Sequence, residues 1–418
     1  MTVTPPSVGT NRGGSNAKGL RTYNQAVVLD AIRRHDSISR VEIAELTGLT
    51  SQTVTNICRR LLDQGIIEEA GKKATPLGKS RTALRPKPNG LFAIGVQFDP
   101  DASRAAILDL GGHVTLHRDF SPEPGADPGS VLELIASTVQ DLLNDAGADP
   151  DRVLGIGVGV PGPLDPVKGM LFEPPHLTHW HDVPLRETLE QLTGYPVVVD
   201  KDVTAAAVAE MWYGSGDATD TTAVIYVGTG VGLGVYTNGE IIRGFSGNAG
   251  EIGHIIVDPD GVPCACGRRG CVGTTSSASC LVERLLPGAS GVLEGMTALT
   301  EGAAADPEWA RELDQAMDGL VELARTIAGL YDVNRLRLGG PMWDFFADRL
   351  TPERLRRMGG RTGVPAVHPI SCAASELGAD LGTIGAACLV FDSFLSPRVG
   401  QLSSLTTSHP PMQAAQGW

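Results

Sequence analysis

The sequence of 418 residues predicts an α/β protein in which a small helix-turn-helix head precedes a larger body of alternating strands and helices. Residues 21–64 contain three short amphipathic segments at helical spacing, with Gly48 before the third. A cationic strand-loop-strand pattern follows over residues 66–85, as in the wing of a winged helix. From residue 91 onward, apolar runs of strand length alternate with helical patterns, which indicates an α/β domain.

The first 20 residues have little apolar content and many Gly, Pro, Ser and Asn residues, so they predict a disordered arm. The first helix is expected from Arg21 to about residue 35, before Asp36 and Ser37. The second is expected over residues 39–47, and the third over residues 51–64 with a cap at Thr50 or Ser51. In a helix-turn-helix the third of these helices enters the major groove of DNA.

The outward side chains of this third helix are hydrogen-bonding or cationic: Ser51, Gln52, Thr53, Thr55, Asn56, Arg59 and Arg60. Gln52 and Asn56 have the amide groups that read base edges, while the two arginines suit phosphate or bases. A small helical protein-interaction module with a solvated polar face is the alternative interpretation of this triplet alone.

The wing and the charge distribution favour DNA. Strands are expected over residues 66–70 and 82–85, and the connection between them carries Lys72, Lys73, Lys79 and Arg81 without an acidic residue. Residues 1–90 contain 14 Lys and Arg against 7 Asp and Glu, so they carry +7, whereas the remainder carries −21. The sequence therefore predicts DNA binding by the head, with Lys79 and Arg81 reaching phosphate or the minor groove.

The body is expected to start after a stiff linker at residues 86–90. Its predicted strands cover residues 91–98, 103–110, 113–120, 153–160 and 197–202, with two more around a Gly turn in 222–242. Helices are expected at residues 129–146, 185–192, 203–213 and 308–331, before an apolar segment at 381–395. The expected boundaries are 21–88 for the head, 89–400 for the body and 401–418 for a disordered tail.

One polar, Gly-rich stretch concentrates metal-binding residues. His254, Cys264, Cys266 and Cys271 follow the spacing H-x9-C-x-C-x4-C. One imidazole and three thiolates form the closed tetrahedral set that a structural Zn²⁺ prefers. The alternatives are a disulfide, which Cys264 and Cys266 are too close in sequence to form comfortably with each other, or unrelated free thiols.

The composition indicates a cytoplasmic protein that does not cross a membrane. No uncharged apolar run approaches the ~20 residues that span a bilayer, and the Pro- and Gly-rich start lacks the apolar core of a signal peptide. An odd count of seven Cys, three of them in one metal-type cluster, suits a reducing compartment.

The same stretch resembles the zinc signature of the ROK family, which contains repressors, open reading frames and sugar kinases. Glu251, Gly253 and His254 match its Glu-x-Gly-His, and residues 264–271 match its Cys-x-Cys-Gly-x-x-Gly-Cys. Residues 39–72 and the stretch Gly78 to Arg81 also resemble the heads of ROK repressors. The resemblance covers residues 21–395 and implies an actin-like body, two lobes with a ligand cleft between them.

The resemblance places a sugar in that cleft, against Gly162, His176, Asp202, Glu251 and His254. Asp202 stands where kinases of the family keep their catalytic base, although an acidic residue between a strand and a helix is also a common N-cap. Two positions depart from the family pattern, because His176 replaces an Asn and Gly273 replaces a carboxylate. These departures suggest a ligand different from plain glucose, or weaker binding.

Of the two phosphate loops of the family kinases, this chain resembles the second and departs from the first. The run Gly228 to Gly234 resembles the second phosphate loop, though a Gly-rich β-turn would look the same. Family kinases place Asp-x-Gly-Gly-Thr after the first strand, but here Gln97 replaces the first Asp, while Asp99, Pro100 and Asp101 follow. A similar motif at residues 109–113 follows the second strand and reads as a hairpin turn. The sequence therefore predicts that the cleft is not an enzyme active site.

The expectation is a sequence-specific transcriptional regulator, a repressor of carbohydrate metabolism, whose affinity for operator DNA depends on a sugar or sugar derivative. Heads of this kind work in pairs, so a homodimer or homotetramer is expected. One alternative is an ATP-dependent sugar kinase with an appended DNA-binding head. Another is a docking module that senses a sugar transporter.

Overall fold

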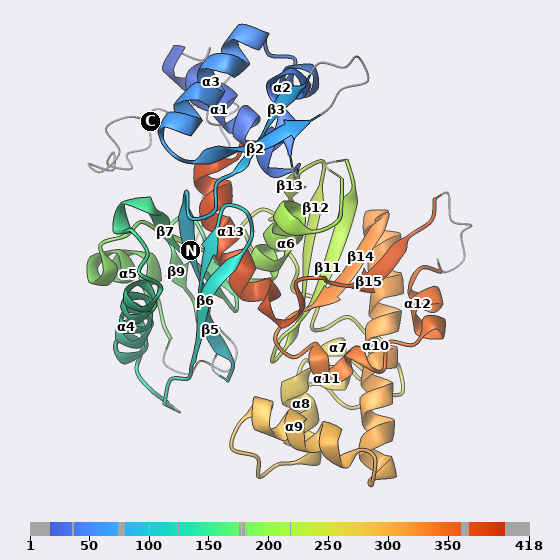
Figure 1. Cartoon of the computed structure of the whole chain (residues 1–418). Coiled ribbons are helices and arrows are strands. Elements are labelled where there is room, and N and C mark those ends of the chain that lie inside the picture. Colours follow the sequence, from blue (N-terminus) through green and yellow to red (C-terminus); the bar gives the residue numbers. More distant parts are fainter. Residues whose placement is uncertain are drawn as a thin grey trace. The chain divides into compact units, whose positions relative to one another are not determined.

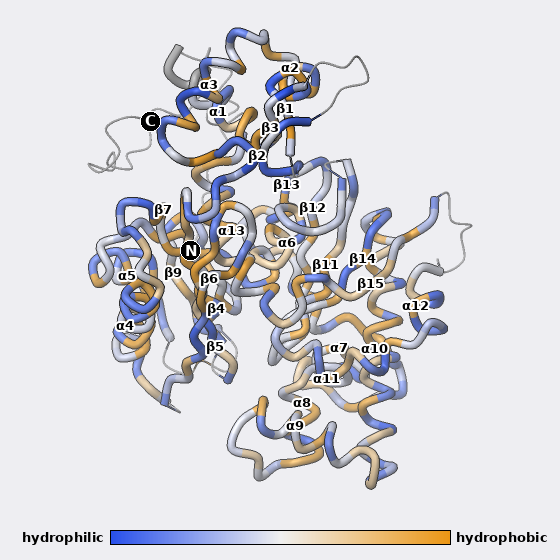
Figure 2. Tube along the Cα trace, in the orientation of Figure 1, coloured by the Kyte–Doolittle hydropathy of each residue, from blue (hydrophilic) through white to orange (hydrophobic). Residues whose placement is uncertain are grey.

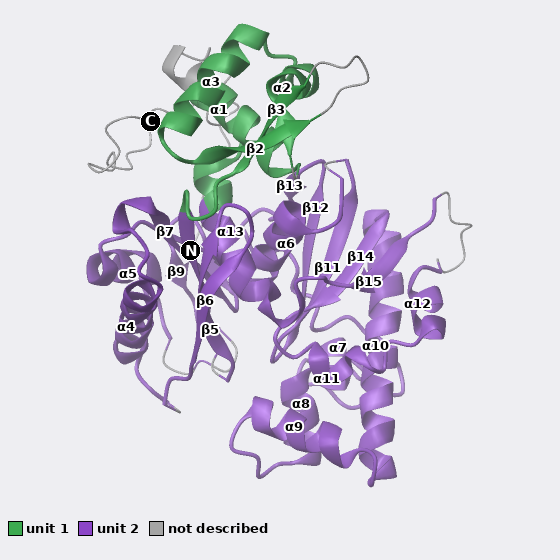
Figure 3. Ribbon diagram, in the orientation of Figure 1, with its two compact units in different colours: residues 1–91, 391–418 green, residues 92–390 purple. Residues whose placement is uncertain are grey.

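The computed structural model describes residues 17–35, 37–73, 80–99, 101–123, 125–174, 177, 180–217, 219–360 and 368–397, with side chains from residue 22 onward. The chain divides into two compact units, residues 1–91 with 391–418 and residues 92–390 (Figure 3). Residues 1–16 of the predicted arm and the predicted tail at 401–418 lie outside the described residues.

The head contains the three predicted helices and the predicted wing strands. Its helices are α1 (Ala17–Arg33), α2 (Arg40–Thr47) and α3 (Ser51–Asp63). Its strands β1 (Ile38–Ser39), β2 (Ile67–Lys73) and β3 (Arg81–Pro86) form an antiparallel sheet in the order β1-β3-β2. The expected arm was partly wrong, because α1 begins at Ala17. Once a helix is nucleated, each added residue gains one backbone hydrogen bond, so α1 extends beyond its apolar face.

Side-chain caps fix the turn between α2 and α3. The backbone N–H of Ser39 donates to Glu42 Oε2 at 2.8 Å, and the N–H of Glu42 donates to Ser39 Oγ at 3.4 Å. Hydrogen bonds to the carboxyl, first from the Ser39 backbone and then from the Ser39 and Lys73 side chains, lower the pKa of Glu42 to about 2. Gly48 ends α2 with φ 68°, a left-handed conformation that glycine adopts without strain. Thr50 then caps α3 by accepting from Thr53 N.

The predicted linker is partly integrated into the head. Pro86 is the last residue of β3, and Lys87 N donates to Ile66 O at 2.9 Å. The head buries apolar residues from all three helices and from β3: Val28, Leu29, Ile32, Ile43, Val54, Ile57, Leu61 and Leu84. It therefore has a hydrophobic core of its own.

The body opens with a five-stranded sheet in the order β10-β7-β4-β5-β6 (Figure 1). The strands are β4 (Phe92–Gln97), β5 (Ser103–Asp109), β6 (Val114–Phe120), β7 (Val153–Val160) and β10 (Val197–Lys201). The first three form an antiparallel meander, and β7 and β10 extend it in parallel. Helices α4 (Pro128–Ala146) and α5 (Leu185–Thr193) pack together on its outer face.

A second sheet repeats this topology in the order β13-β12-β11-β14-β15. The strands are β11 (Thr221–Val227), β12 (Val231–Thr237), β13 (Glu240–Ile241), β14 (Arg335–Gly339) and β15 (Ser371–Ala374). Again a meander of three strands is extended by two parallel strands. The body thus has the two-lobed, actin-like architecture that the resemblance implied.

Two helices lie between the sheets, and each follows the fifth strand of its own sheet: α6 (Asp202–Tyr213) and α13 (Leu381–Leu395). Glycines make this packing possible. A Cβ on Gly157 of β7 would lie 1.7 Å from Ala386 O, and one on Gly385 would lie 2.2 Å from Ala205 O. Figure 2 shows hydrophobic stretches along these strands and helices. The Gly-rich pattern of residues 153–160 is therefore a helix-packing surface as well as a strand.

The remaining elements complete the two lobes. The helices are α7 (Val272–Thr275), α8 (Ala278–Leu285), α9 (Val292–Gly302), α10 (Pro307–Tyr331), α11 (Asp344–Ala347) and α12 (Pro352–Met358). Short 3-10 turns at Pro150–Arg152 and Gly378–Asp380 and the two-stranded ribbon β8 (Leu164–Asp165) and β9 (Met170–Leu171) complete the set. By length and composition alone, Gly378–Leu395 could span a membrane, but 72% of that segment is buried inside the protein.

Candidate functional site

The recognition helix α3 presents a polar face. Ser51, Gln52, Asn56 and Arg59 are exposed, and Thr53 and Thr55 are half-buried. Gln52 Nε2 donates to Asn56 Oδ1 at 3.2 Å, so the two amides form one pair on the outside of the helix. The hydroxyl of Thr55 donates back to Ser51 O at 2.7 Å.

The two arginines of α3 differ in their surroundings. Both are exposed, but Arg60 Nη1 also donates to Gln25 Oε1 of α1 at 3.1 Å. In the wing, Arg81 begins β3 and pairs across the ribbon with Lys73, whose ammonium lies 3.1 Å from Glu42 Oε1. Lys79 lies outside the described residues. Among the described residues, Arg59 and Arg81 have no acidic partner, so the head offers both as cations.

A pocket of about 230 Å³ lies between the two lobes of the body. It brings together three of the predicted sugar-site residues, Gly162, Asp202 and Glu251. The other lining residues are Asp101, Pro161, Lys201, Val203, Tyr226, Gly228, Thr229, Gly230, Val231, Gly232, Gly250, Ser279 and Val292. His254 is absent from the lining and belongs to the cysteine cluster instead, and His176 lies outside the described residues.

Lys201 is the pocket residue that the sequence analysis missed. It ends β10 and is 2% exposed. Its ammonium forms an ion pair with Glu251 Oε1 and donates to Ala249 O at 3.1 Å. Gly162 leaves room for this pair, because a Cβ there would lie 3.0 Å from Lys201 Cε and 3.2 Å from Glu251 Oε1. Lys201 thus holds the segment that presents Glu251 to the pocket.

Asp202 sits at the start of α6 without acting as its N-cap, which is Lys201. Its Oδ1 accepts from Val203 N at 2.7 Å, so it belongs to the first turn of the helix. Burial raises the pKa of the Asp202 carboxyl to about 7, although the Val203 N–H and the charge of Lys201 oppose the shift. Asp202 therefore changes charge near neutral pH.

The loop after β4 brings carboxylates to the glycine turn of the other lobe. Asp99 is 8% exposed, and its Oδ2 accepts from Thr229 Oγ1 at 2.8 Å. Asp101 lines the pocket, and its Oδ1 accepts from Val292 N at 3.4 Å, at the start of α9. Burial raises the pKa of Asp99. The acidic residues therefore bond to the second lobe, close to where the expected phosphate loop lies.

The run of glycines from Gly228 to Gly234 has two uses. Cβ atoms on Gly232 and Gly234 would lie 2.3 Å from Val203 Cγ1 and 2.2 Å from Val203 O, so these glycines admit α6 against β12. Gly228 and Gly230 form the turn of the β11–β12 hairpin, with a bond from Gly228 N to Gly230 O, and both line the pocket. The structure therefore shows a Gly-rich β-turn at the start of the run and a helix-packing surface at its end.

Tyr226 lines the pocket from β11 and is 3% exposed. Its hydroxyl has no hydrogen-bond partner among the described residues. Burial raises the pKa of this phenol well above its usual value, so it remains a donor. By contrast, Trp180 is 2% exposed and stacks on Phe98 with ring centroids 5.1 Å apart. Trp180 is a core residue and does not line the pocket.

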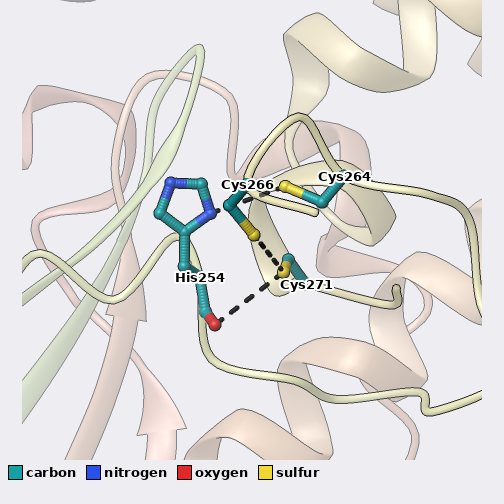
Figure 4. Close-up of side chains that lie close together, drawn as sticks. All are labelled: His254, Cys264, Cys266 and Cys271. Atoms are coloured by element: carbon teal, nitrogen blue, oxygen red, sulfur yellow. Dashed lines mark hydrogen bonds between the residues drawn. The ribbon is translucent and has the colours of Figure 1, made fainter. Parts of the chain in front are cut away.

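The ligand atoms of His254, Cys264, Cys266 and Cys271 all lie within 4.8 Å of one another (Figure 4). Cys266 Sγ lies 3.7 Å from Cys271 Sγ, and Cys264 Sγ lies 3.5 Å from His254 Nδ1. A tetrahedral zinc ion with Zn–S bonds of about 2.3 Å separates its sulfur ligands by about 3.8 Å. These four side chains can therefore hold a metal ion, and the seven cysteines are all free thiols.

Backbone turns build this cluster. Gly267 N donates to Cys264 O at 2.9 Å, and Val257 N donates to Gly270 O at 2.8 Å. Gly270 has φ 64°, and a Cβ there would lie 1.4 Å from Asp258 O, so only glycine fits. Hydrogen bonding by Arg268 lowers the pKa of the Cys266 thiol to about 6. Cys271 is buried directly before α7.

The departure at Gly273 also has a structural basis. Gly273 N donates to Gly253 O at 2.9 Å, and a Cβ on Gly273 would lie 2.8 Å from the same oxygen. No side chain fits here without a backbone shift. The similar motif at residues 109–113 forms the predicted hairpin turn, closed by a bond from Asp109 N to His113 O at 3.1 Å.

Comparison with known families separates the two units. Residues 93–393 match the ROK family, and residues 21–73 match the MarR family. The first match covers the body, and the second covers the three helices and β2 of the head.

Two curated relatives resemble the chain over a shorter span. The xylose repressor of Caldicellulosiruptor bescii is 29% identical over 264 residues, 63% of this chain and 66% of that protein. The Escherichia coli K12 DNA-binding transcriptional dual regulator NagC is 29% identical over 273 residues, 65% of this chain and 66% of that protein. Each match thus spans slightly less than two thirds of the relative.

Two solved structures share the fold. A ROK family transcriptional regulator, a homologue of the E. coli MLC protein, has a TM-score of 0.70 at 23% identity and covers 91% of this chain and 98% of its own. A ROK family glucokinase from Streptomyces griseus, solved with glucose and AMPPNP, has a TM-score of 0.59 at 28% identity. It covers 71% of this chain and 98% of its own.

Proposed function

The chain belongs to the ROK family, and from this premise we propose that it is a transcriptional repressor whose affinity for operator DNA is set by a sugar. One observation supports this more than any other. The chain carries both a winged helix-turn-helix head and a pocket lined by Gly162, Asp202 and Glu251. Its relatives include proteins named as xylose repressor and as DNA-binding regulator, which supports regulation of carbohydrate metabolism.

On the DNA side, α3 enters the major groove with Gln52 and Asn56 toward base edges. Arg59 and Arg81 contact phosphates, which adds affinity that falls with salt. Ser51, Thr53, Thr55, Arg60 and Lys79 complete the proposed DNA surface. The protein acts in the cytoplasm as a homodimer or homotetramer on a site of approximate two-fold symmetry.

On the sugar side, Asp202 and Glu251 accept hydrogen bonds from ligand hydroxyls. Asp202 begins α6 after the first sheet, and Glu251 follows the second sheet, so a bound sugar bridges the two lobes. A ligand changes DNA affinity only if it binds one arrangement of the protein better than another. The lobes provide such arrangements, and only five residues separate β3 of the head from β4 of the body.

The four residues His254, Cys264, Cys266 and Cys271 would hold Zn²⁺ as a structural ion. Their donor atoms suit zinc in type and in separation. Four protein ligands leave no open position, so the ion supplies rigidity to the loop that begins near Glu251.

We further propose that the pocket does not phosphorylate its ligand. Gln97, Asp99 and Asp101 occupy the place of the first phosphate loop. Gln97 is buried under α13, and the two carboxylates are hydrogen-bonded to the second lobe. A sugar kinase with a DNA-binding head is the second candidate, because the fold is shared with a glucokinase. ATP turnover measured with a panel of hexoses and amino sugars separates the two, and phosphorylation of any panel sugar at an enzymatic rate would favour the kinase.

The proposal is tested by selecting binding sites for the full-length protein from random-sequence DNA. If the protein is a repressor, the recovered motif is expected to have two-fold symmetry. One sugar of the panel is then expected to shift the affinity of the protein for this DNA about 5- to 150-fold. Failure to enrich any sequence would contradict operator binding. An enriched sequence without a responding sugar would contradict sugar sensing alone.

A further inference from the structure

The charges around the pocket indicate the chemical class of its ligand. We propose that the pocket selects an uncharged carbohydrate. It rejects nucleotides and the phosphate ester of the same sugar. This inference rests on the proposed sugar sensing and adds which ligands the pocket accepts. Asp101, the loop residue that faces both the pocket and α9, is the residue to which we assign the rejection of phosphate.

The pocket has an excess of acidic groups. Asp101, Asp202 and Glu251 line it, and Asp99 lies directly behind the glycine turn. Lys201 is the one basic residue among the described residues that line it. Its ammonium has three N–H groups, and three acceptors surround it: Glu251 Oε1, Ala249 O at 3.1 Å and Asn248 O at 3.5 Å. No cation in this lining is therefore left to receive a phosphate or carboxylate of a ligand.

The donors that would suit an anion already hold carboxylates of the chain. Backbone N–H groups at helix starts and in glycine turns commonly bind phosphate. Here the N–H of Val292, at the start of α9, donates to Asp101 Oδ1. The hydroxyl of Thr229, inside the glycine turn, donates to Asp99 Oδ2. A ligand phosphate near this turn would have to displace one of these two carboxylates. It would then still lie close to the negative charge of the other.

The remaining polar groups suit hydroxyls. Asp202 and Glu251 accept hydrogen bonds, and a sugar hydroxyl donates to a carboxylate without bringing a charge of its own. The buried hydroxyl of Tyr226 lies against Gly382 of α13 and does not face the ligand. The whole set therefore fits a neutral polyol best.

Matched pairs of ligands test the inference. The full-length protein is titrated calorimetrically with glucose, xylose and N-acetylglucosamine, and with the phosphate ester of each. A sugar that binds is expected to do so at least about tenfold more tightly than its ester, because one unfavourable charge contact near neutral pH readily costs a factor of ten. Mg·ADP is expected to show no heat of binding in the same range.

Two variants locate the effect. Asp101→Asn keeps an oxygen for Val292 N but removes the charge, so it is expected to narrow the difference between sugar and ester several-fold. Asp348→Asn is the control, because this exposed aspartate is outside the pocket lining and its substitution changes the net charge equally.

The outcomes are distinguishable. An ester that binds the wild-type protein as tightly as its parent sugar, or more tightly, would overturn the inference and leave sugar sensing intact. An unchanged difference in Asp101→Asn would overturn the assignment to this carboxylate. A protein that bound neither form of any sugar would overturn the proposed sensing function, and this inference with it.

Discussion

Tyr226 provides a test of the pocket at the scale of one residue. Its buried hydroxyl has no partner among the described residues, and an unsatisfied buried hydroxyl costs about 1–3 kcal/mol. Tyr226→Phe is therefore expected to leave the melting temperature unchanged or raised. Sugar affinity is expected to stay unchanged, because the hydroxyl is buried against Gly382 of α13 and out of reach of a ligand. Thermal denaturation and calorimetric titration measure the two effects.

Tyr236→Phe is the matched control, since Tyr236 is also buried on the neighbouring strand but is outside the pocket lining. It is expected to leave sugar affinity unchanged. If Tyr226→Phe lowered sugar affinity and Tyr236→Phe did not, the hydroxyl would serve the ligand.

Asp202 predicts a pH dependence. Burial raises the pKa of its carboxyl to about 7, with Lys201 opposing the shift and Asp99 and Glu251 adding to it. The folded protein therefore binds more protons than the unfolded chain between about pH 4, where an exposed aspartate titrates, and pH 7. This carboxyl accordingly lowers the free energy of unfolding as pH rises through that window.

The same titration affects the ligand. The ionised form accepts hydrogen bonds from hydroxyls more strongly, so sugar affinity is expected to fall as pH drops from 8 to 6. Asp202→Asn should flatten this profile and bind weakly throughout. Titrations of both proteins with the responding sugar at several pH values check this prediction. If sugar affinity depended on pH as steeply in Asp202→Asn as in the wild type, another group would be responsible.

The sequence predicted part of this site. Gly162, Asp202 and Glu251 were found because family motifs surround them, and the structure brings all three to one pocket. Lys201 was missed because a lysine at the end of a strand reads as solvated, and its partner Glu251 lies 50 positions later. Tyr226 was missed because a tyrosine within an apolar strand reads as core.

At the scale of elements, the metal loop makes a separate prediction. Purified protein is expected to contain about one zinc per chain, and Cys264→Ser or Cys266→Ser should release it, because a structural site needs all four ligands. Metal analysis and limited proteolysis around residues 258–270 are the measurements. Cys280→Ser is the control, since Cys280 lies outside the cluster and should leave the metal bound. Freshly reduced protein without zinc would contradict the assignment.

The recognition helix predicts a salt effect. Arg59→Ala and Arg81→Ala are each expected to weaken operator binding and to lower the slope of log affinity against log salt by about one, for one lost phosphate contact. Arg356→Ala removes an exposed charge from α12 of the body and should leave the slope unchanged. Equal slopes for all three variants and the wild type would place the DNA surface elsewhere.

The elements themselves were well predicted, because helical and strand periodicities are strong in this sequence. The three helices of the head, the strands of the first sheet, and β11 and β12 of the second sheet occur close to their predicted ranges, whereas β14 and β15 were not predicted. The start of α1 was missed because Gly19 and the Gly-, Ser- and Asn-rich sequence before Ala17 are typical of a disordered segment. The double use of the Gly228 to Gly234 run was beyond sequence, since it depends on α6 lying against β12.

At the scale of the whole molecule, the body consists of two similar sheets that pack on a shared pair of helices. Both sheets have the same strand order, and α6 and α13 lie between them. From the sequence, the repeat was visible only as two strand-turn-strand patterns. Its full form depends on β14 and β15, which pair with the sheet only in the folded chain. Helices α7 to α10 separate β13 from β14 in sequence, and α11 and α12 separate β14 from β15.

The central claim is that the pocket controls DNA binding, and Glu251 tests it most directly. Its carboxylate lines the pocket, lies outside the metal cluster and is 67% exposed. Without it, the buried ammonium of Lys201 keeps Ala249 O and Asn248 O as acceptors, so its removal should spare the fold and the zinc. Asp202→Ala should behave in the same way, whereas His254→Ala should lose the metal as well.

The decisive measurement is the affinity of full-length wild-type and Glu251→Ala protein for the selected operator, with and without the responding sugar. The account predicts that the sugar shifts wild-type affinity by about 5- to 150-fold, corresponding to ~1–3 kcal/mol of coupling. It predicts that Glu251→Ala binds the operator as the wild type does, retains its zinc and shows no shift. A Glu251→Ala protein that responds to the sugar like the wild type would show that the signal is sensed elsewhere in the chain.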